Sequence, residues 1–399
     1  MSPSEPKPPG PARSIWTHAS WLLLGGYSIV LPIPLVTGSV FLFASETWRG
    51  HLFGIDLLLM AVFPVALFFA LRFKTRWPRV RRAPWALAVA ILLASLTLAL
   101  SAPRGEKDSA SGPRIVYLLE GESYPRFSPF NWAPEIDQVK VGTYLIAALD
   151  RLIDARQSQQ LRQLCMDLYR PMEAEPGWRE LGTALPYGYA SFWNTNCDRG
   201  HAYVYEPPAL VTSPRPVLLF VHGSAGNFKA YLYVWKSFAD RHGFAIVAPT
   251  YGFGNWDHQG GLDTLRRARD WIDRQPTLDS KRVYIAGLSN GGKGVGLIVD
   301  READRYAGVV LISAVAPKRQ PGEAAWKSRW RHMPVLMLHG GEDDRVPLTY
   351  AQQVARDLES GQAQVCLETY WKENHFLFYS KREEILVRVA AWMDLPDHP

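Results

Sequence analysis

The sequence has few cysteines and no pattern of metal ligands. Three cysteines in 399 residues are too few for the disulfide framework that stabilises small secreted domains. The histidines His242, His258 and His332 have no Cys, His or paired-carboxylate neighbours at metal-ligand spacing, so we expect no metal site and no cofactor. There is no internal repeat, and 47% hydrophobic residues exclude disorder for most of the chain.

Excess charge is also missing from most of the chain. Lys and Arg total 44 against 38 Asp and Glu, a net charge of +6. Residues 1–102 hold nine of the basic and three of the acidic side chains, so residues 103–399 hold 35 of each sign. Nucleic-acid binding usually requires a basic surface, and we therefore expect no nucleic-acid partner.

Long apolar runs are present only in the first quarter. They cover residues 21–44, 52–71 and 85–102, and Asp56 is their only charged residue. A helix needs roughly 20 such residues to cross a bilayer. A signal peptide has a shorter apolar core of about 7–15 residues, so the pattern predicts three transmembrane helices and a lipid bilayer as partner.

The loops between these runs differ in charge, which predicts their orientation. Residues 72–82 contain six Lys and Arg, whereas residues 45–51 contain Arg49 opposed by Glu46. Basic loops stay in the cytoplasm. We therefore expect a cytoplasmic tail at residues 1–20 and an extracytoplasmic location for everything after Ala102, as in a protein of the bacterial inner membrane.

Two kinds of segment follow the apolar region. Residues 103–135 are rich in Pro, Gly, Ser and mixed charge, which favours an exposed tether. Apolar residues then recur every three or four positions between 136 and 170, which predicts a pair of amphipathic helices. This part of the 103–199 segment either packs on the domain that follows or forms a lid over it.

From about Gly200 short apolar runs alternate with helical stretches. Such buried runs are typical of a parallel sheet with helices on both faces, so we predict an α/β fold over residues 200–399. The expected strands are 202–206, 217–221, 244–248, 283–286, 308–312, 335–338 and 365–370. The expected helices lie near 229–241, 262–274, 290–301, 348–359 and 380–393.

One serine lies in a turn that suits a nucleophile. Gly287-Leu288-Ser289-Asn290-Gly291 follows an expected strand and precedes an expected helix. Small neighbours allow a strained turn that exposes the serine hydroxyl. A hydroxyl needs a base and an orienting carboxylate, and Asp343 and His375 follow later expected strands in the order Ser, Asp, His.

The motifs HGSAGN, GLSNGG, HGGEDDRVP and ENH together resemble the α/β-hydrolase superfamily, in particular esterases related to dienelactone hydrolase, polyhydroxyalkanoate depolymerases and prolyl oligopeptidases. The resemblance covers residues 200–399 and implies an α/β-hydrolase fold. It further implies the site residues, which are Ser289 as nucleophile, Asp343 as acid with Asp344 and Glu342 as fallbacks, His375 as base, and the Ser224 and Asn290 N–H groups as oxyanion hole.

The segment GGKGVG, which directly follows the turn at Ser289, departs from the pattern of this superfamily. With the residues before it, this segment matches a second motif. Residues 287–293 read G-x-x-x-x-G-K, as in a phosphate-binding loop, but Gly294 stands where a Ser or Thr should bind magnesium. A Ser289–Lys293 dyad is a further alternative. A lysine that faces solvent or caps the core is the simpler interpretation.

Two further assignments are weaker. Tyr251, Phe253 and Trp256 follow an expected strand and are predicted to line a pocket for the acyl or alcohol group of the substrate, although core packing would explain them too. Cys165 and Cys197 are predicted to form a disulfide in an oxidising compartment.

These patterns predict a membrane-anchored serine hydrolase that acts on small or lipid-like carboxylic esters. A peptidase of the prolyl-oligopeptidase type and an extracytoplasmic acyltransferase are alternatives with the same chemistry. A membrane receptor or assembly protein with an inactive hydrolase fold is the alternative from another class.

Overall fold

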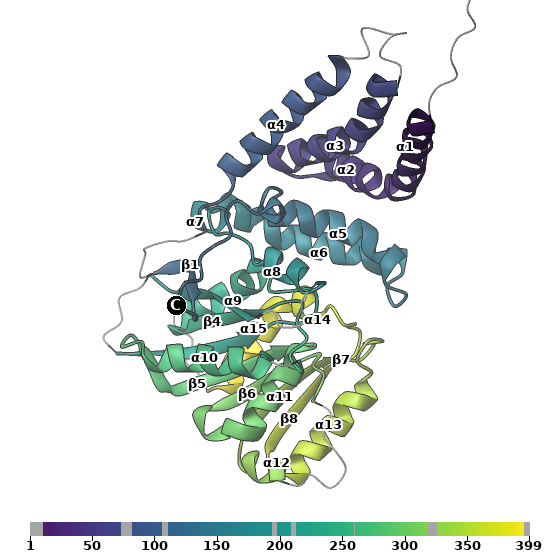
Figure 1. Cartoon of the computed structure of the whole chain (residues 1–399). Helices are drawn as coiled ribbons and strands as arrows, with labels where there is room; N and C mark the ends of the chain where they lie inside the picture. Colours follow the sequence, from purple (N-terminus) through teal and green to yellow (C-terminus); the bar gives the residue numbers. More distant parts are fainter. Residues whose placement is uncertain are drawn as a thin grey trace, which may run out of the picture. The chain divides into compact units, whose positions relative to one another are not determined.

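A computed structural model describes residues 11–72, 82–105, 111–193, 198–208, 213–258, 260–317 and 325–394. The chain divides into two compact units, which are described separately (Figure 1). Unit 1 contains residues 1–102 and 132–141. Unit 2 contains residues 103–131 and 142–399.

Unit 1 is built from apolar helices. They are α1 (Pro11–Val30), α2 (Pro32–Ala44), α3 (Trp48–Arg72), α4 (Ala83–Ser101) and the start of α5 (Glu135–Leu149). Helices α3 and α4 are long and apolar enough to cross a membrane. The predicted first span is broken, because residues 21–30 and α2 meet at a 45° bend where Pro32 lacks the N–H of a continuous helix.

Two buried carboxylates of unit 1 accept hydrogen bonds from other segments. Asp56 on α3 is buried and accepts a 2.9 Å hydrogen bond from the Ser95 hydroxyl on α4, so it joins two helices. Asp137 on α5 accepts hydrogen bonds from the Glu46 N–H at 2.5 Å and the Thr47 hydroxyl at 2.5 Å. The start of α5 is thereby bound to the turn between α2 and α3. Most of the basic loop lies outside the described residues, so its cytoplasmic location stays a prediction.

Unit 2 contains one sheet whose strands are ordered β1-β2-β4-β3-β5-β6-β7-β8. Strands β3 to β8 are all parallel to one another, and β2 is antiparallel to both β1 and β4. The predicted, mostly parallel sheet is confirmed. The strands are β1 (Gly112–Tyr117), β2 (Asp198–Glu206), β3 (Arg215–Val221), β4 (Ala245–Tyr251), β5 (Leu278–Leu288), β6 (Gly308–Ile312), β7 (Pro334–Gly340) and β8 (Gln364–Tyr370).

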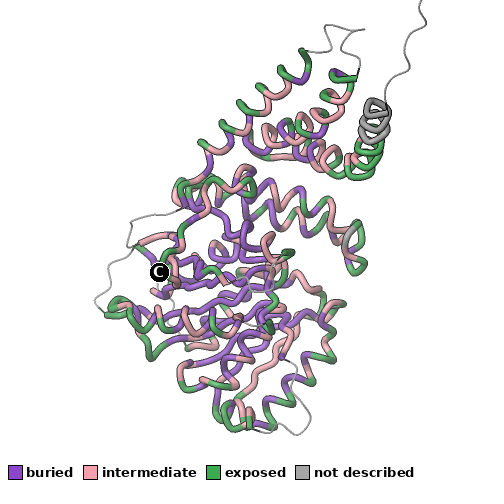
Figure 2. The backbone as a smooth tube through the Cα atoms, in the orientation of Figure 1, coloured by how far each residue is buried: buried purple, intermediate pink, exposed green. Residues whose placement is uncertain are grey.

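Helices cover both faces of this sheet. Alternate residues of the strands, such as Val217 and Leu219 of β3, pack with α10 (Gly261–Asp273), α11 (Gly291–Glu302) and α13 (Leu348–Ser360). Phe220, the residue of β3 that follows Leu219, faces the opposite side of the sheet. Its ring packs there on the rings of Trp235 and Phe378. That side carries α9 (Lys229–His242), α14 (Leu377–Ser380) and α15 (Arg382–Trp392). Figure 2 shows the central strands of unit 2, such as β4 and β6, as buried, whereas the edge strand β8 is of intermediate burial.

Shorter elements complete unit 2. They are η2 (Pro129–Asn131), α6 (Ala155–Ala174), α7 (Pro176–Arg179), α8 (Leu185–Ala190), η3 (Ala303–Arg305) and α12 (Ala325–Arg329). The predicted amphipathic pair corresponds to α5 and α6, and Asp154 and Gln157 form a capping box at the start of α6. Lys229 of α9 binds Glu173 of α6 at 2.7 Å, so α6 packs on the body of the unit.

The tether prediction is wrong for residues 112–117. They form β1, an edge strand paired with β2 from Gly112 opposite Glu206 to Tyr117 opposite His201. The fold therefore includes chain well before Gly200. The run is short and is flanked by Gly and Pro, and its hydrogen-bond partner lies 80 or more residues away, so local pattern did not reveal it.

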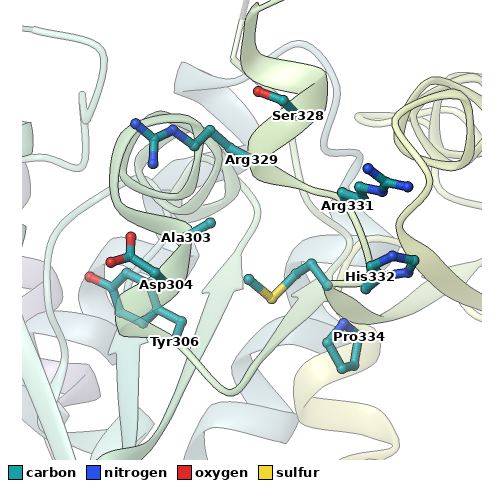
Figure 3. A pocket seen from close by; sticks show the side chains of 9 residues that line it. Ala303, Asp304, Tyr306, Ser328, Arg329, Arg331, His332 and Pro334 are labelled. Carbon is teal, nitrogen blue, oxygen red and sulfur yellow. The ribbon is translucent and has the colours of Figure 1, made fainter.

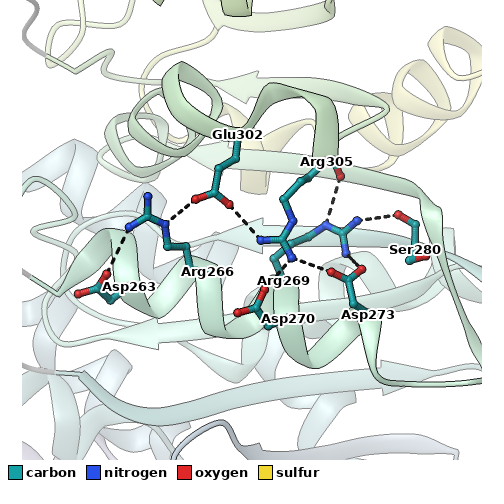
Figure 4. A network of polar contacts seen from close by, with 8 residues as sticks. All are labelled: Asp263, Arg266, Arg269, Asp270, Asp273, Ser280, Glu302 and Arg305. Atoms are coloured by element: carbon teal, nitrogen blue, oxygen red, sulfur yellow. Dashed lines mark hydrogen bonds and ion pairs between the residues drawn. The ribbon is translucent and has the colours of Figure 1, made fainter.

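An ion-pair network joins α10 to the end of α11 (Figure 4). Arg269 is buried and donates to the Ser280 carbonyl oxygen at 2.6 Å and to Asp273. Arg305 of η3 contacts Asp270 at 2.7 Å and Asp273 at 2.6 Å, and Arg266 binds Glu302 at 2.5 Å. Charged side chains that share several partners stabilise a fold more than isolated surface pairs do, so this network reinforces the scaffold under the sheet.

Candidate active site

Ser289 occupies a sharp turn between β5 and α11. Its φ of +48° lies in the left-handed region, which is strained for a residue with a Cβ. The Ser289 N–H donates to the Ile312 carbonyl at 3.0 Å, and its own carbonyl accepts from the N–H groups of Gly292 and Val315 at 3.0 and 2.9 Å. These three hydrogen bonds hold the strained turn and present the hydroxyl above the sheet edge.

Glycines make room for this turn. A Cβ on Gly291 would lie 2.1 Å from the Val221 carbonyl oxygen, and one on Gly223 would lie 3.3 Å from the Ser289 Cβ. Strand β3 and the loop after it therefore approach the elbow at backbone distance. Side chains at these positions would push the elbow away from the loop.

We expect Gly291→Ala to destabilise the protein by at least about 2 kcal/mol, because the new methyl group meets a backbone oxygen that cannot move freely. Gly142→Ala on α5 is the matched control, since its Cβ would contact nothing within 4 Å. That change should be neutral or slightly stabilising. Denaturant unfolding of the full chain in detergent measures both, and equal stability of the two variants would contradict the proposed close approach.

The three residues predicted for the triad meet at the carboxyl ends of their strands. His375 Nε2 lies 3.0 Å from Ser289 Oγ. His375 Nδ1 lies 2.9 Å from Asp343 Oδ2 and 3.1 Å from Oδ1. The contacts form one continuous hydrogen-bond chain from carboxylate to imidazole to hydroxyl, which is the geometry that activates a serine.

Asp343 is shaped to stay ionised. Its side chain is completely buried, and Oδ1 accepts hydrogen bonds from the N–H groups of Arg345 at 3.0 Å and Val346 at 2.9 Å. Burial by itself would raise the pKa of Asp343. The hydrogen bonds from His375 and Val346 outweigh this effect, so the pKa of Asp343 lies below its usual value. A permanent carboxylate fixes the imidazole with its Nδ1 proton toward Asp343.

The fallback acids do not reach the histidine by any hydrogen bond of the described residues. Asp344 accepts from Gln157 of α6 at 3.4 Å, and the Glu342 N–H donates to the Glu373 carbonyl at 2.9 Å. Arg345 binds Asp150 at 2.5 Å, 195 residues earlier. This ion pair joins the loop that carries Asp343 to the turn between α5 and α6. No local sequence pattern predicts it.

The two predicted oxyanion donors lie side by side. Asn290 Nδ2 donates a 2.7 Å hydrogen bond to Ser224 Oγ, joining the elbow to the loop after β3. In the described part of the chain, no backbone acceptor is recorded for the Ser224 or Asn290 N–H, whereas the Ala225 N–H donates to Phe253 at 3.1 Å. These two N–H groups therefore remain the predicted donors to a developing oxyanion.

Tyr251 and Trp256 are core residues, so the prediction that they contact substrate is corrected. Their exposed fractions are 1% and 0%. Trp256 Nε1 donates to the His222 carbonyl at 2.8 Å, and the indole fills the space above Gly294. Both side chains support the loop after β3 from below, which is a structural role.

Two buried histidines also support this loop in neutral form. His222 Nδ1 donates to the Gly223 carbonyl at 2.8 Å, and its Nε2 accepts from the Tyr251 N–H at 3.2 Å. Burial lowers the pKa of His222 to about 4. His201 contacts Thr250 Oγ1 at 2.7 Å. Burial and the neighbouring His222 lower the pKa of His201 to about 3.

We expect the free energy of unfolding to fall as the pH drops from about 6.5 towards 4. The unfolded chain protonates these imidazoles near pH 6.5, whereas the folded one keeps them neutral, so the unfolded state binds more protons. The loss for His222 alone is on the order of 3 kcal/mol. His222→Gln should flatten the profile, while His258→Gln, at an exposed site, should not. An equal pH dependence of the free energy of unfolding in wild type, His222→Gln and His258→Gln would contradict this role of His222.

Lys293 is engaged elsewhere. Its Nζ lies 3.1 Å from Asp257 Oδ2, on the loop after β4, and not on Ser289. The Ser289–Lys293 dyad is therefore not formed. Among the described residues, no group of three or more His, Cys, Asp and Glu side chains is arranged to hold a metal.

The predicted disulfide is not supported. Cys165 on α6 is a free cysteine that is 5% exposed, and burial raises its pKa to about 12. Cys197 lies outside the described residues. The Cys165 side chain instead belongs to the buried apolar stripe of α6.

A surface hollow lies away from the triad (Figure 3). It is at the amino ends of β6 and β7, whereas Ser289, Asp343 and His375 follow the carboxyl ends of their strands. It is lined by Ala303, Asp304, Tyr306, Ser328, Arg329, Arg331, His332, Met333 and Pro334. Ligands of parallel α/β sheets bind at the carboxyl ends, so we do not place substrate in this hollow.

The described site is a chain of hydrogen bonds from Asp343 through His375 to Ser289 at the carboxyl ends of a mostly parallel sheet, and comparisons show which known proteins the chain is similar to. No protein-family model matches the chain. It is 32% identical over 148 residues to the bifunctional acetylxylan esterase/xylanase XynS20E of Neocallimastix patriciarum, covering 36% of this chain and 21% of that protein. It is 28% identical over 142 residues to the poly(3-hydroxybutyrate) depolymerase of Ralstonia pickettii, covering 29% of each.

A third relative is acetylxylan esterase A of Aspergillus oryzae, 24% identical over 127 residues, with 28% of this chain and 41% of that protein covered. The chain spans less than half the length of these curated relatives. Because they are esterases and a depolymerase of a polyester, the resemblance that the motifs indicated is confirmed.

The chain is also similar to solved structures, one of which is Thermogutta terrifontis esterase 2 phosphonylated by cyclosarin. It is 16% identical with a TM-score of 0.41, covering 50% of this chain and 91% of that one. Another is the S-formylglutathione hydrolase FrmB from Staphylococcus aureus, 18% identical with a TM-score of 0.40, covering 48% and 89%.

Proposed function

We propose that the protein is a membrane-anchored serine hydrolase that cleaves carboxylic esters through an acyl-enzyme. One observation carries this proposal, the continuous chain of hydrogen bonds from Asp343 through His375 to the strained Ser289. The named activities of the curated relatives favour an ester over a peptide or an acyl-transfer acceptor.

In the proposed reaction the Ser289 oxygen attacks the ester carbonyl while His375 Nε2 takes the hydroxyl proton. The resulting oxyanion lies against the N–H groups of Ser224 and Asn290, each of which contributes roughly 3 kcal/mol to transition-state stabilisation. The imidazolium then protonates the leaving alcohol. In the second half His375 takes a proton from water, the hydroxide attacks the acyl-enzyme, and Ser289 is regenerated with release of the acid.

The proposed location is extracytoplasmic for the catalytic domain and cytoplasmic for the N-terminus, in a bacterial inner membrane. Two helices apolar enough to span a membrane, and the six basic residues of positions 72–82, support this topology. Periplasmic and cytoplasmic reporters fused after residue 110 test it. Activity of the cytoplasmic reporter alone would overturn the topology without affecting the proposed chemistry.

Labelling by a fluorophosphonate probe tests the enzyme proposal. The Ser289 oxygen should displace the probe's leaving group in wild type, and Ser289→Ala should remain unlabelled. The same preparation should hydrolyse p-nitrophenyl acetate. An unlabelled, inactive wild type of native stability would instead favour the receptor or assembly-protein alternative.

A further inference from the structure

A pair of aromatic rings lies beside the candidate oxyanion hole. One of them, Phe253, lies on the loop that follows β4. A Cβ on Gly254 would lie 2.3 Å from the Gly223 carbonyl oxygen, and Gly223 itself packs on Ser289. The Phe253 carbonyl also accepts the 3.1 Å hydrogen bond from the Ala225 N–H. Phe253 is therefore on a segment that lies directly against the oxyanion loop, residues 222–227.

A second segment reaches the same loop. A Cβ on Gly188 of α8 would lie 3.6 Å from the Ala225 carbonyl oxygen. The turn that follows α8 is held by hydrogen bonds from the N–H groups of Phe192 and Trp193 to the carbonyls of Tyr189 and Ala190, at 3.2 and 3.0 Å. The Phe192 ring then meets the Phe253 ring at 5.3 Å and 51°.

These rings are left in solvent although they touch each other. Phe192 is 67% exposed, and the neighbouring Trp193 is 90% exposed. Phe253 is half-buried. Exposed aromatic clusters next to a site are typical of ligand contacts, since flat rings stack on flat apolar partners at little entropic cost.

We infer that Phe192 and Phe253, extended by Trp193, form a subsite that binds a flat apolar group of the ester next to its scissile carbonyl. The inference rests on the proposed esterase function. The group is an aromatic ring or the apolar face of a sugar ring, because the phenyl rings offer stacking surface and no hydrogen-bonding groups. Continuity with the oxyanion loop is the reason that the occupant is substrate and not a separate partner.

The test measures kcat/KM of the full chain in detergent for three acetates. They are ethyl acetate, 1-naphthyl acetate and a fully acetylated methyl xyloside. Phe192→Leu keeps an apolar side chain but removes the flat ring. We expect it to lower kcat/KM for 1-naphthyl acetate about tenfold through KM, with ethyl acetate unchanged within twofold. Phe192→Tyr should retain wild-type selectivity. A parallel loss with the xyloside identifies the sugar face, and no such loss identifies an aromatic group.

Phe127→Leu is the matched control, because Phe127 is 63% exposed and stacks on Arg126. Equal effects of Phe192→Leu on all three acetates, or none, would overturn the subsite. The subsite would also be overturned if Phe192→Leu kept the wild-type selectivity but bound phosphatidylcholine vesicles more weakly. That result would make the rings a membrane contact.

Binding without turnover separates this inference from the proposed function. Quenching of tryptophan fluorescence by 1-naphthyl acetate is measured in Ser289→Ala and in the double variant with Phe192→Leu. A tenfold weaker affinity of the double variant supports the subsite even if no ester is hydrolysed by wild type. Equal affinities reject it even if the esterase activity is established.

Discussion

Replacing Ser289 by alanine is expected to lower kcat for ester hydrolysis by about 10⁶-fold, the largest effect of any single change in the chain. Triad members act as a unit, so removing the nucleophile forfeits the contribution of His375 and Asp343 as well. Initial rates with p-nitrophenyl acetate, corrected for the uncatalysed reaction, give the measurement. A loss below about a hundredfold would show that another group is the nucleophile.

A companion variant separates chemistry from folding. Ser289→Gly is equally inactive, but glycine adopts the +48° φ without the cost that a Cβ imposes. We therefore expect Ser289→Gly to be more stable than Ser289→Ala by about 1 kcal/mol in denaturant unfolding. The reverse order would mean that the elbow is not strained in solution.

Asp343→Asn is the second large effect, a loss of about 10⁴-fold in kcat at neutral pH. The amide preserves the shape, but it no longer holds the His375 proton on Nδ1, so Nε2 is not available as the base for Ser289. The same measurement on Asp344→Asn is a matched control one residue away, and we expect less than a threefold change. A larger effect at Asp344 than at Asp343 would reassign the triad acid.

Asp343 also contributes to stability in a defined pH window. Its folded pKa is lowered, so the folded state favours the carboxylate more than the unfolded state does. The contribution is complete above the usual carboxyl pKa and is lost as the pH falls through the lowered value. Asp343→Asn should remove this acid-side dependence and leave the His222 dependence between about 6.5 and 4 unchanged.

Local pattern was sufficient for much of this molecule. The strands before Ser289 and Asp343 end in buried apolar residues, and the strand before His375 is partly buried, so all three appear as short apolar runs whose carboxyl ends could be placed within a few residues. The predicted triad followed because its members come after the carboxyl ends of the parallel strands β5, β7 and β8, which lie at one edge of the sheet. The apolar helices α3 and α4 were equally visible, since a bilayer demands composition and length and not particular contacts.

Contacts between distant segments were decided only by the tertiary structure. Strand β1 is an edge strand whose identity depends on pairing with β2, and Tyr251 and Trp256 are core residues because α11 and the loop after β3 close over them. The Asp150–Arg345 ion pair and the Asn290–Ser224 hydrogen bond join residues 195 and 66 positions apart.

The sequence by itself thus determined the long apolar helices, the mostly parallel sheet and the chain order of Ser289, Asp343 and His375, because each of these depends on periodicity, composition or a short motif. Only the tertiary structure decided which carboxylate reaches His375, which aromatic rings are buried and which border the oxyanion loop. Those outcomes depend on side-chain packing between segments far apart in the chain, and no local pattern encodes such packing.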